Sequence, residues 1–552
     1  MNHNEIIVNI NNHPDIKVKK NTTILDFLSE IDYDNQYPIV AATVNNNLCE
    51  LTTSLTEDAS INLLDITTDT GARIYRRTAT FILIKAAYNI FPNRRIMIKH
   101  ALSNGLYCEF MDRDTNPEEV NLIKQEMADI VKDNDFINRL VLSKDEAINI
   151  FEKQGQDDKV ALLKLRDKED IHVYELKGFY EYFYGYLAPS TNIVNDFDLF
   201  FYNDGLIMRT PGVRDPDFKK PYKEQTKLAA IFKEAKKWAD MLETPHVAAL
   251  DKKIINNEID EIIQINEALH EKKIALIADE ICADQDKRII LISGPSSSGK
   301  TTFAERLLIQ LKVNGKKPIS ISMDNYFVDR ELTPLDEEGN YNFEALEALK
   351  LELFNEHLIS LLNGEEITMP IFNFHTGTTE PEGLRCGVPI GEPIIIEGIH
   401  ALNDKLTYSI PAKNKYRIYV SALTQLNVDY SNRIATTDCR LLRRLIRDSR
   451  TRGYSALETI SRWPSVRRGE EINVFPFQEN ADIMVNTSLV YELAIIKPYA
   501  EKLLNEIGRE HPEYAEAQRL LKFLSFFKEA NTDKIPPNSI LREFIGGSWL
   551  NC

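Results

Sequence analysis

Residues 294–302, Gly-Pro-Ser-Ser-Ser-Gly-Lys-Thr-Thr, have the spacing G-x-x-x-x-G-K-[ST]. An apolar run at 288–293 precedes them, and a helical pattern over 303–313 follows. Glycines let backbone N–H groups turn inward around an anion, and a helix N-terminus adds positive charge. We therefore expect this loop to bind the phosphates of ATP, with Lys300 at the β- and γ-phosphates and the Thr301 hydroxyl on Mg²⁺. The alternative is a fortuitous glycine turn. The expected ATP-binding residues of the loop are Gly294, Pro295, Ser296, Ser297, Ser298, Gly299, Lys300, Thr301 and Thr302.

Two acidic residues follow the next apolar runs. Asp324 comes after an expected strand at 318–323, and Glu397 comes after another at 393–396. Sites in open α/β sheets form at the carboxyl ends of strands. Asp324 is therefore expected to deprotonate an acceptor hydroxyl, and Glu397 to join the Mg²⁺ shell with Thr301. The alternatives are a helix or turn cap for Asp324 and an ordinary strand-end acid for Glu397.

A basic helix follows. Arg440, Arg443, Arg444 and Arg447 have the spacing i, i+3, i+4, i+7 and share one face. Residues 433–468 hold ten arginines, no lysine and three acidic residues, in a chain of net charge −18. Planar guanidinium groups suit phosphate oxygens, so we interpret the helix as a lid that closes over the γ-phosphate. Arg444 is assigned to catalysis, Arg443 and Arg447 to ATP and Arg440 to the acceptor. The alternatives are a solvated face or an RNA-binding surface.

The elements that must position these residues divide the 552-residue chain into several parts. Length alone suggests three or four domains. From 289 onward, buried strands alternate with helices, which is typical of a parallel α/β sheet. Earlier, we expect helices at 78–90 and 117–133, a hairpin at 196–208 with its turn at 203–205, and helical spacing over 254–281. The expected parts are 1–66, a small β-rich unit; 67–245, a mixed α/β region; 246–287, a helical connector; 288–520, the phosphate-binding domain; and 521–552, a tail with no assigned role.

Composition narrows the cellular context. The acidic balance argues against general binding to nucleic acid or anionic membranes, although a local basic site is compatible with it. Six scattered cysteines without CxxC spacing are typical of reduced thiols in a cytosolic protein. The polar N-terminus is not a secretory signal, and no apolar run is long enough to span a bilayer. We expect a cytoplasmic protein without a membrane partner.

The second half of the chain resembles the uridine kinase/phosphoribulokinase family. Six segments match in the family's order across most of 289–490: GPSSSGKTT (294–302), SMDNYF (322–327), YNF (341–343), MPIFNF (369–374), IIIEGIHAL (394–402) and RLLRRLIRDSRTRG (440–453). The resemblance implies a P-loop kinase domain, a parallel sheet with helices on both faces. It implies that Asp324 is the catalytic base, that Glu397 is the Mg²⁺-associated acid and that the arginine helix is the lid.

The same resemblance indicates where an acceptor would bind. It implies substrate contacts at Tyr326, Glu347, Phe372, Phe374, His375 and Arg440. Uridine kinases typically follow Asn-Phe with Asp-His-Pro-Asp, whereas residues 344–347 here read Glu-Ala-Leu-Glu, and Glu347 could replace the ribose-binding Asp. The positions of the base-contacting His and Arg hold Gly377 and Thr379. Phosphoryl transfer is unaffected by these departures, but uracil specificity is left open.

The first half resembles the front end of threonyl-tRNA synthetase. Residues 44–65 (VNNNLCELTTSLTEDASINLLD) resemble its TGS domain, a β-grasp fold. Residues 76–92, 103–110, 179–191 and 205–211 resemble its α+β editing domain. The editing site normally carries His-x-x-x-His and Cys-x-x-x-His, but here those places hold Arg76, Thr80, Phe183 and Leu187. Without such ligands the usual zinc chemistry has no support. This region could bind RNA or tRNA, sense a small molecule, mediate assembly or serve as a scaffold.

Two classes of function follow from the sequence. The first is an ATP- and Mg²⁺-dependent kinase of a nucleoside, in which uridine- or cytidine-type 5′-phosphorylation is expected, with another sugar or polyol as a variant. The second is an RNA- or tRNA-associated regulatory ATPase. Aminoacyl-tRNA editing is disfavoured by the missing ligands. We also expect a homo-oligomer.

Overall fold

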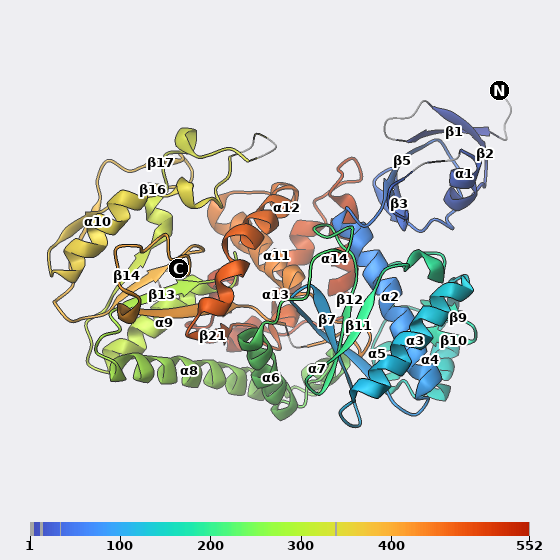
Figure 1. The fold of residues 1–552 in the computed structure, drawn as a ribbon, viewed down its shortest axis with the longest axis horizontal. Helices are drawn as coiled ribbons and strands as arrows, with labels where there is room; N and C mark the ends of the chain where they lie inside the picture. The colour runs from blue at the N-terminus through green and yellow to red at the C-terminus, as the bar shows by residue number, and fades with distance from the viewer. Residues whose placement is uncertain are drawn as a thin grey trace.

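The computed structural model describes residues 5–10, 15–31, 33, 35–336, 339, 341–424 and 426–550. In Figure 1 the first unit, in dark blue, lies above the middle unit at the right, and the last unit, with its parallel sheet, occupies the left of the view. No helix in the described ranges is long and apolar enough to cross a membrane. The expected multidomain α/β architecture is confirmed.

The first unit is a five-stranded sheet with one helix. Its strand order is β2-β1-β5-β3-β4, with β1 and β5 parallel and the other pairs antiparallel. Alternate residues of β1 are buried, as the alternating sequence predicts. Thr23 caps the helix by accepting a hydrogen bond from the Asp26 amide. The elements are β1 (Glu5–Ile10), β2 (Ile16–Lys19), α1 (Ile24–Glu30), β3 (Ala41–Val44), β4 (Asn47–Cys49) and β5 (Ala59–Leu64).

The middle unit contains two antiparallel sheets, ordered β11-β12-β7-β6 and β10-β9-β8. The predicted helix at 117–133 and the hairpin turn at 203–204 are confirmed. The helix predicted at 78–90 begins earlier, because Thr68 caps it by accepting from the Gly71 amide. The elements are α2 (Asp69–Ile90), β6 (Ile96–Leu102), β7 (Gly105–Phe110), α3 (Pro117–Asp133), β8 (Asn138–Ser143), α4 (Lys144–Lys153), α5 (Asp157–Lys164), β9 (Asp170–Leu176), β10 (Phe179–Glu181), β11 (Asp198–Tyr202) and β12 (Gly205–Arg209).

Three helices connect this unit to the last sheet: α6 (Thr226–Met241), α7 (Val247–Ile255) and α8 (Ile259–Ala283). The helical pattern predicted over 254–281 is interrupted at its start. Asn257 has φ 60°, a left-handed conformation that ends α7 and separates it from α8. Helix α8 then runs along the lower edge of the molecule in Figure 1.

The last unit is built on a parallel sheet with the order β14-β19-β13-β20-β21. The chain leaves β13 toward β14 and later returns to β20 on the other side, so the end of β13 is a topological switch point. The strands are β13 (Ile289–Ser293), β14 (Ile319–Ser322), β19 (Ile394–Glu397), β20 (Lys415–Ser421) and β21 (Ile483–Asn486). Its α-helices are α9 (Lys300–Val313), α10 (Leu351–Leu362), α11 (Thr436–Arg447), α12 (Ala456–Asn473), α13 (Glu492–Leu504), α14 (Tyr514–Leu524) and α15 (Leu541–Ile545). Four short strands form a side arm: β15 (Ile367–Met369), β16 (Phe372–Asn373), β17 (Thr378–Thr379) and β18 (Leu384–Cys386).

Alternate residues of the central strand face different cores. Ile290 and Ile292 of β13 pack with side chains of α8 and α9, whereas Ile289 and Leu291 pack with α10. Every residue of β13 is buried for this reason. Helices therefore cover both faces of the sheet, which explains why the sequence shows a continuous apolar run instead of an alternating one.

The middle and last units share hydrophobic cores. Phe232 of α6 packs in one cluster with Ile207 of β12 and Tyr419 of β20. A second shared cluster joins α4 and α5 to α11, α13 and α14. The boundary expected between 520 and 521 falls inside α14, and the residues that follow pack back onto the last unit. The segment expected to be a tail is therefore part of the folded core.

Candidate active site

The loop between β13 and α9 has the backbone that an anion-binding nest requires. Ser297 and Gly299 both adopt positive φ, 58° and 83°. At Gly294 an added Cβ would lie 1.9 Å from the carbonyl oxygen of Val420, so only glycine fits there. The expected strand–loop–helix arrangement is present, and its amides lie at the N-terminus of α9.

Lys300 begins α9 and extends over this loop. Its ammonium donates to the carbonyl oxygen of Pro295 at 3.2 Å. Burial lowers the pKa of Lys300, and the nearby carboxylates of Glu397 and Asp324 only partly oppose that shift. Within the described ranges no carboxylate lies within ion-pair distance of this ammonium. A bound anion would therefore supply the partner that the chain does not.

Three oxygen groups meet at the end of β19. Glu397 accepts from the Ser322 hydroxyl at 3.0 Å and from the Thr301 hydroxyl at 3.4 Å. Burial raises the pKa of Glu397 to about 7, although Lys300 opposes the shift. Mg²⁺ prefers hard oxygen ligands and usually takes few of them from the protein. The Thr301 hydroxyl and the Glu397 carboxylate fit that preference.

Asp324 lies in a short 3₁₀ turn, Met323–Tyr326, that follows β14. Its charge influences the pKa values of Lys300, Glu397 and Arg452, so it shares one site with all three. In the part of the chain that the structure describes, its carboxylate accepts no hydrogen bond, and the capping alternative has no such bond to support it. A carboxylate that accepts no hydrogen bond from the described chain can accept a proton from a bound acceptor.

The inner half of the arginine face differs from what the sequence predicts. Arg440 pairs with Glu470 of α12 and donates to the Ser296 carbonyl oxygen, and Arg443 pairs with Glu492 of α13 at 2.6 Å. Their side chains are 1% and 0% exposed. We expected Arg443 to contact ATP and Arg440 to contact the acceptor. Instead, both are buried supports behind the phosphate loop, because acidic residues of α12 and α13 neutralise them.

The outer half of the face remains at the site. Arg444 and Arg447 lie 3.1 and 2.9 Å from Asp448, and Arg452 lies 3.8 Å from the same carboxylate. Arg444 also donates to the Ser296 hydroxyl at 2.8 Å. The charge of Arg447 and burial lower the pKa of Arg452 to about 10. Three guanidinium groups share one carboxylate, which leaves net positive charge beside the loop.

The expected acceptor residues separate into two groups. Tyr326 is 1% exposed, and its hydroxyl is 2.9 Å from Nδ1 of His357, so it belongs to the core and not to an acceptor site. Phe372 is also buried. Phe374, by contrast, is 41% exposed, and the Arg452 guanidinium lies 5.3 Å from its ring centre. Glu347 and His375 are exposed.

Sequence reasoning missed Glu344. Burial raises the pKa of Glu344 to about 7, and the charges of Arg444, Asp324 and Lys300 act on it, so this carboxylate faces the phosphate site. His400 is also buried, beside the backbone of Glu344 and Ala345. The signal was available, because Glu344 directly follows the Asn342-Phe343 pair that the resemblance identifies.

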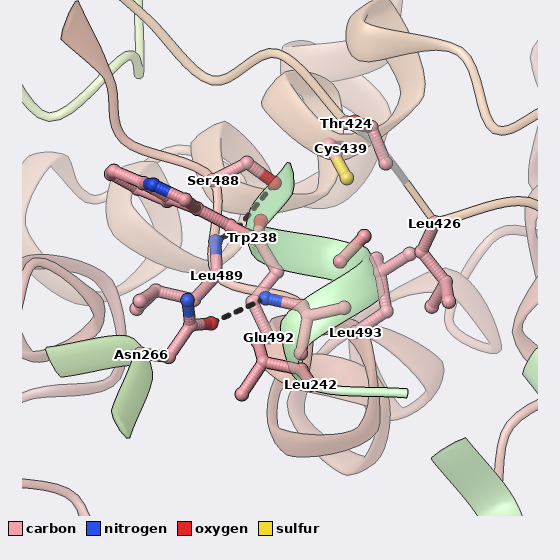
Figure 2. Close-up of a pocket in the computed structure, with 12 residues that line it drawn as sticks. Trp238, Leu242, Asn266, Thr424, Leu426, Cys439, Ser488, Leu489, Glu492 and Leu493 are labelled. Atoms are coloured by element: carbon pink, nitrogen blue, oxygen red, sulfur yellow. Dashed lines mark hydrogen bonds between the residues drawn. The ribbon is translucent and has the colours of Figure 1, made fainter. Parts of the chain in front are cut away.

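A separate pocket lies where the connector meets the last unit (Figure 2). Trp238 of α6, Asn266 of α8, Cys439 of α11 and Glu492 near the start of α13 line it. Its polar groups bond within the protein: Asn266 accepts from the Val490 amide and Glu492 from the Leu489 amide, both at 2.9 Å. Because these polar groups already form hydrogen bonds within the protein, we interpret the pocket as a packing contact between helices.

The positions of the editing-type ligands lie inside the middle unit. Thr80 donates to the Arg76 carbonyl oxygen, while Phe183 and Leu187 are buried in an apolar cluster with Phe81. The segment after β20 reaches this unit, since Asn427 donates to the Ile98 carbonyl oxygen at 2.7 Å. The side chains at these positions therefore pack inside the middle unit, which also contacts the last unit.

The model of the Phosphoribulokinase / Uridine kinase family matches residues 289–493. Among solved structures, a possible uridine kinase from Bacillus stearothermophilus aligns over 39% of this chain and 98% of its own, with 18% identity and a TM-score of 0.28. D-glycerate 3-kinase from Cryptococcus neoformans var. grubii aligns over 49% and 90%, with 14% identity and a TM-score of 0.24.

The N-terminal region matches threonine–tRNA ligases. The ligase of Clostridium tetani is 32% identical over 178 residues, which is 32% of this chain and 28% of the ligase. That of Carboxydothermus hydrogenoformans is 29% identical over 182 residues, 33% of this chain and 29% of the ligase. The chain thus spans less than a third of the length of each ligase. Both resemblances inferred from the sequence are confirmed.

Proposed function

We propose that this protein transfers the γ-phosphate of Mg·ATP to a hydroxyl group of a small molecule, and that the acceptor is a nucleoside phosphorylated at its 5′ position. The match of residues 289–493 to the model of the Phosphoribulokinase / Uridine kinase family supports the transfer. One observation carries the proposal. Lys300, Asp324 and Arg447 converge on the phosphate loop, and Lys300 and Asp324 are not neutralised by ion pairs within the described chain. Such charges await a charged ligand.

The residues divide the work of phosphoryl transfer. The loop amides and Lys300 hold the β- and γ-phosphates, and Arg444 with Arg447 stabilises the charge that develops on the transferred group. Asp324 orients the acceptor hydroxyl and accepts its proton. Thr301 and Glu397 would hold Mg²⁺, which when bound neutralises charge on the phosphate oxygens. Catalysis is therefore mainly positioning and electrostatics.

A nucleoside fits the polar and aromatic groups beside Asp324. Carboxylates such as Glu344 and Glu347 accept hydrogen bonds from ribose hydroxyls, and the exposed ring of Phe374 offers a surface for a base. His375 is exposed on the same arm and can contact the base. Another sugar or polyol would use the carboxylates without the aromatic ring, and this difference separates the two acceptor classes.

An RNA-associated regulatory ATPase is the second candidate, and the similarity of the N-terminal region to threonine–tRNA ligases favours it. The arginine helix does not supply the RNA surface, because Arg440 and Arg443 are buried and Arg444 and Arg447 are 12% and 14% exposed. Under this candidate, the tRNA contact is therefore assigned to the N-terminal units, which carry the similarity. The homo-oligomeric state and the cytoplasmic location stay predictions.

ADP release from Mg·ATP against a panel of nucleosides, sugars and polyols tests the proposal. Acceptor-dependent turnover is expected with a nucleoside, and Asp324→Asn or Lys300→Ala should abolish it. Hydrolysis that no acceptor stimulates and that survives Asp324→Asn would contradict it. Salt-dependent tRNA binding by the same preparation would then support the regulatory ATPase.

A further inference from the structure

The segment after α14 returns to the phosphate loop. It lies outside the matched family region, which ends at residue 493. Ser539, Ile540 and Phe544 are 0–1% exposed, so the segment is inserted into the fold instead of lying on its surface.

Two contacts join this segment to the phosphate loop and the helix that follows it. Thr302, in the first turn of α9, donates its hydroxyl hydrogen to Glu543 at 2.7 Å. Ile540 covers Gly299, because a Cβ added there would lie 2.8 Å from the Ile540 side chain. Gly299 ends the loop that would carry the phosphates and Thr302 lies in the helical turn that follows it, so the segment supports both.

The same segment also holds the end of the arginine helix. Arg450 donates to the main-chain oxygen of Glu543 at 2.5 Å, and the Arg443 guanidinium lies 5.1 Å from the centre of the Phe544 ring. Arg542 fixes the segment's own shape by donating to the Ile535 carbonyl oxygen at 2.7 Å. The short helix α15 therefore contacts both sides through Glu543, whose carboxylate accepts from Thr302 and whose main-chain oxygen accepts from Arg450.

We propose that Ser539–Gly546 is part of the nucleotide site of this chain and that Glu543 is a positioning residue, whose carboxylate fixes the first turn of α9 through Thr302. Its main-chain oxygen, which every residue at this position retains, accepts from Arg450. This inference rests on the proposed kinase function for its kinetic consequences. Its structural consequence, an ordered loop before any ligand binds, is independent of that function. Preorganised donors bind phosphate better because no ordering is needed at the moment of binding.

The test compares Glu543→Ala, Glu543→Gln and Thr302→Val in the full-length protein, with Glu529→Ala as the matched control. Glu529 is an exposed acid of the same C-terminal region that has no contact with the site. We expect Glu543→Ala and Thr302→Val each to raise the KM for ATP about tenfold, with kcat changed by less than about threefold, since each removes one charge-assisted hydrogen bond. Glu543→Gln, whose amide oxygen can still accept from Thr302, should recover most of the affinity. The double variant Glu543→Ala/Thr302→Val should be no worse than either single variant.

Hydrogen exchange of the amides at 299–302 in the ligand-free protein is the second measurement. Faster exchange in Glu543→Ala and Thr302→Val, but not in Glu529→Ala, is expected whether or not the protein is a kinase. Absence of turnover in the wild type would end the proposed function, while the exchange data would still decide this inference. Unchanged exchange in both variants would overturn it. Tighter ATP binding by Glu543→Ala would also overturn it, because the segment would then obstruct the site.

Discussion

Lys159 of α5 and Lys300 of α9 differ in how the protein surrounds their ammonium groups. Lys159 is 0% exposed and lies 2.7 Å from Glu181, 3.6 Å from Asp429 and 3.8 Å from Asp158. Burial opposes its charge, but these carboxylates outweigh burial, and the pKa of Lys159 is raised. At Lys300 burial wins over more distant carboxylates, and the pKa is lowered.

The two lysines therefore have different roles, one in holding units together and the other in binding. Around Lys159 the partners come from both halves of the chain, since Glu181 lies in β10 and Asp429 follows β20. The charges there satisfy one another and hold two units together. Around Lys300 the protein leaves charge uncompensated, which costs stability and provides a place for an anion. A buried lysine is therefore informative about function only when its partners are also known.

The largest expected effect is on catalysis at Lys300. Lys300→Met should reduce acceptor-dependent turnover by at least about 10³-fold, because charge on the transferred phosphoryl loses its main fixed countercharge. The melting temperature should stay the same or rise, since the ammonium has no carboxylate partner to lose. Steady-state ADP release and thermal scanning on the same preparation check both parts. A large fall in melting temperature would show that Lys300 is structural, as Lys159 is.

The same substitution at Lys159 should lower the stability of the fold instead of its activity. Lys159→Met leaves three carboxylates buried around an apolar side chain and should lower the free energy of unfolding by about 3–5 kcal/mol. The turnover of the molecules that remain folded should change little, because no residue of the phosphate site contacts Lys159. Denaturant unfolding and the specific activity of the folded fraction give the measurement. Adding Glu181→Gln should recover part of the loss, and full stability in Lys159→Met alone would contradict the comparison.

Much of the fold was predictable because its signals are local. Helix α3 was predicted with its final bounds, since Asn116 caps its start, Pro117 occupies its first turn and Asn134 ends it in the left-handed conformation. The phosphate loop was recognisable because its glycines and lysine are adjacent in sequence. The placement of Asp324 followed from the rule that sites lie at the carboxyl ends of strands.

What could not be predicted depends on distant partners. The acidic residues that pair with the buried Arg440 and Arg443 lie 30 and 49 residues further along the chain. Helical spacing alone therefore placed all four arginines of α11 on one functional face. Glu543 meets Thr302 across 241 residues. Tyr326 and Asp324 are two residues apart in a short turn, and only the packing against α10 shows that Tyr326 faces the core.

A smaller loss of stability is expected from the ion pairs by which α14 joins α2 of the middle unit to α11 of the last unit. Arg73 of α2 lies 2.8 Å from Glu516, and Arg519 pairs at 2.7 Å with both Glu516 and Asp438 of α11. Burial would raise the pKa of Glu516, but the two guanidinium groups outweigh it and lower the pKa to about 2. Because the folded pKa lies below the unfolded value near 4.5, Glu516 stabilises the fold above that value, and the contribution is lost as pH falls toward 2.

The matched variant Glu516→Gln should therefore lose on the order of 2 kcal/mol at pH 7 and less at lower pH. Unfolding curves at pH 7, 5 and 4 measure the difference between the variant and the wild type, which should narrow as the pH falls. A difference that stays constant with pH would show that packing, and not charge, explains the effect.

The smallest effect sharpens the comparison inside the phosphate site, at Glu344. Burial raises its pKa to about 7, with Arg444 and Lys300 opposing the shift and Glu470 and Asp324 adding to it. A folded pKa above the unfolded value means that Glu344 destabilises the fold increasingly as pH rises from about 4.5 to 7, and fully above that. Glu344→Gln should consequently raise the melting temperature at pH 8 but not at pH 4. It should also raise the KM for the acceptor about tenfold, because a carboxylate hydrogen bond is replaced by a neutral one. Opposite signs for stability and affinity are typical of a group retained for binding. A variant that loses stability at pH 8 would place Glu344 with Lys159 and Glu516 among the residues that hold the fold.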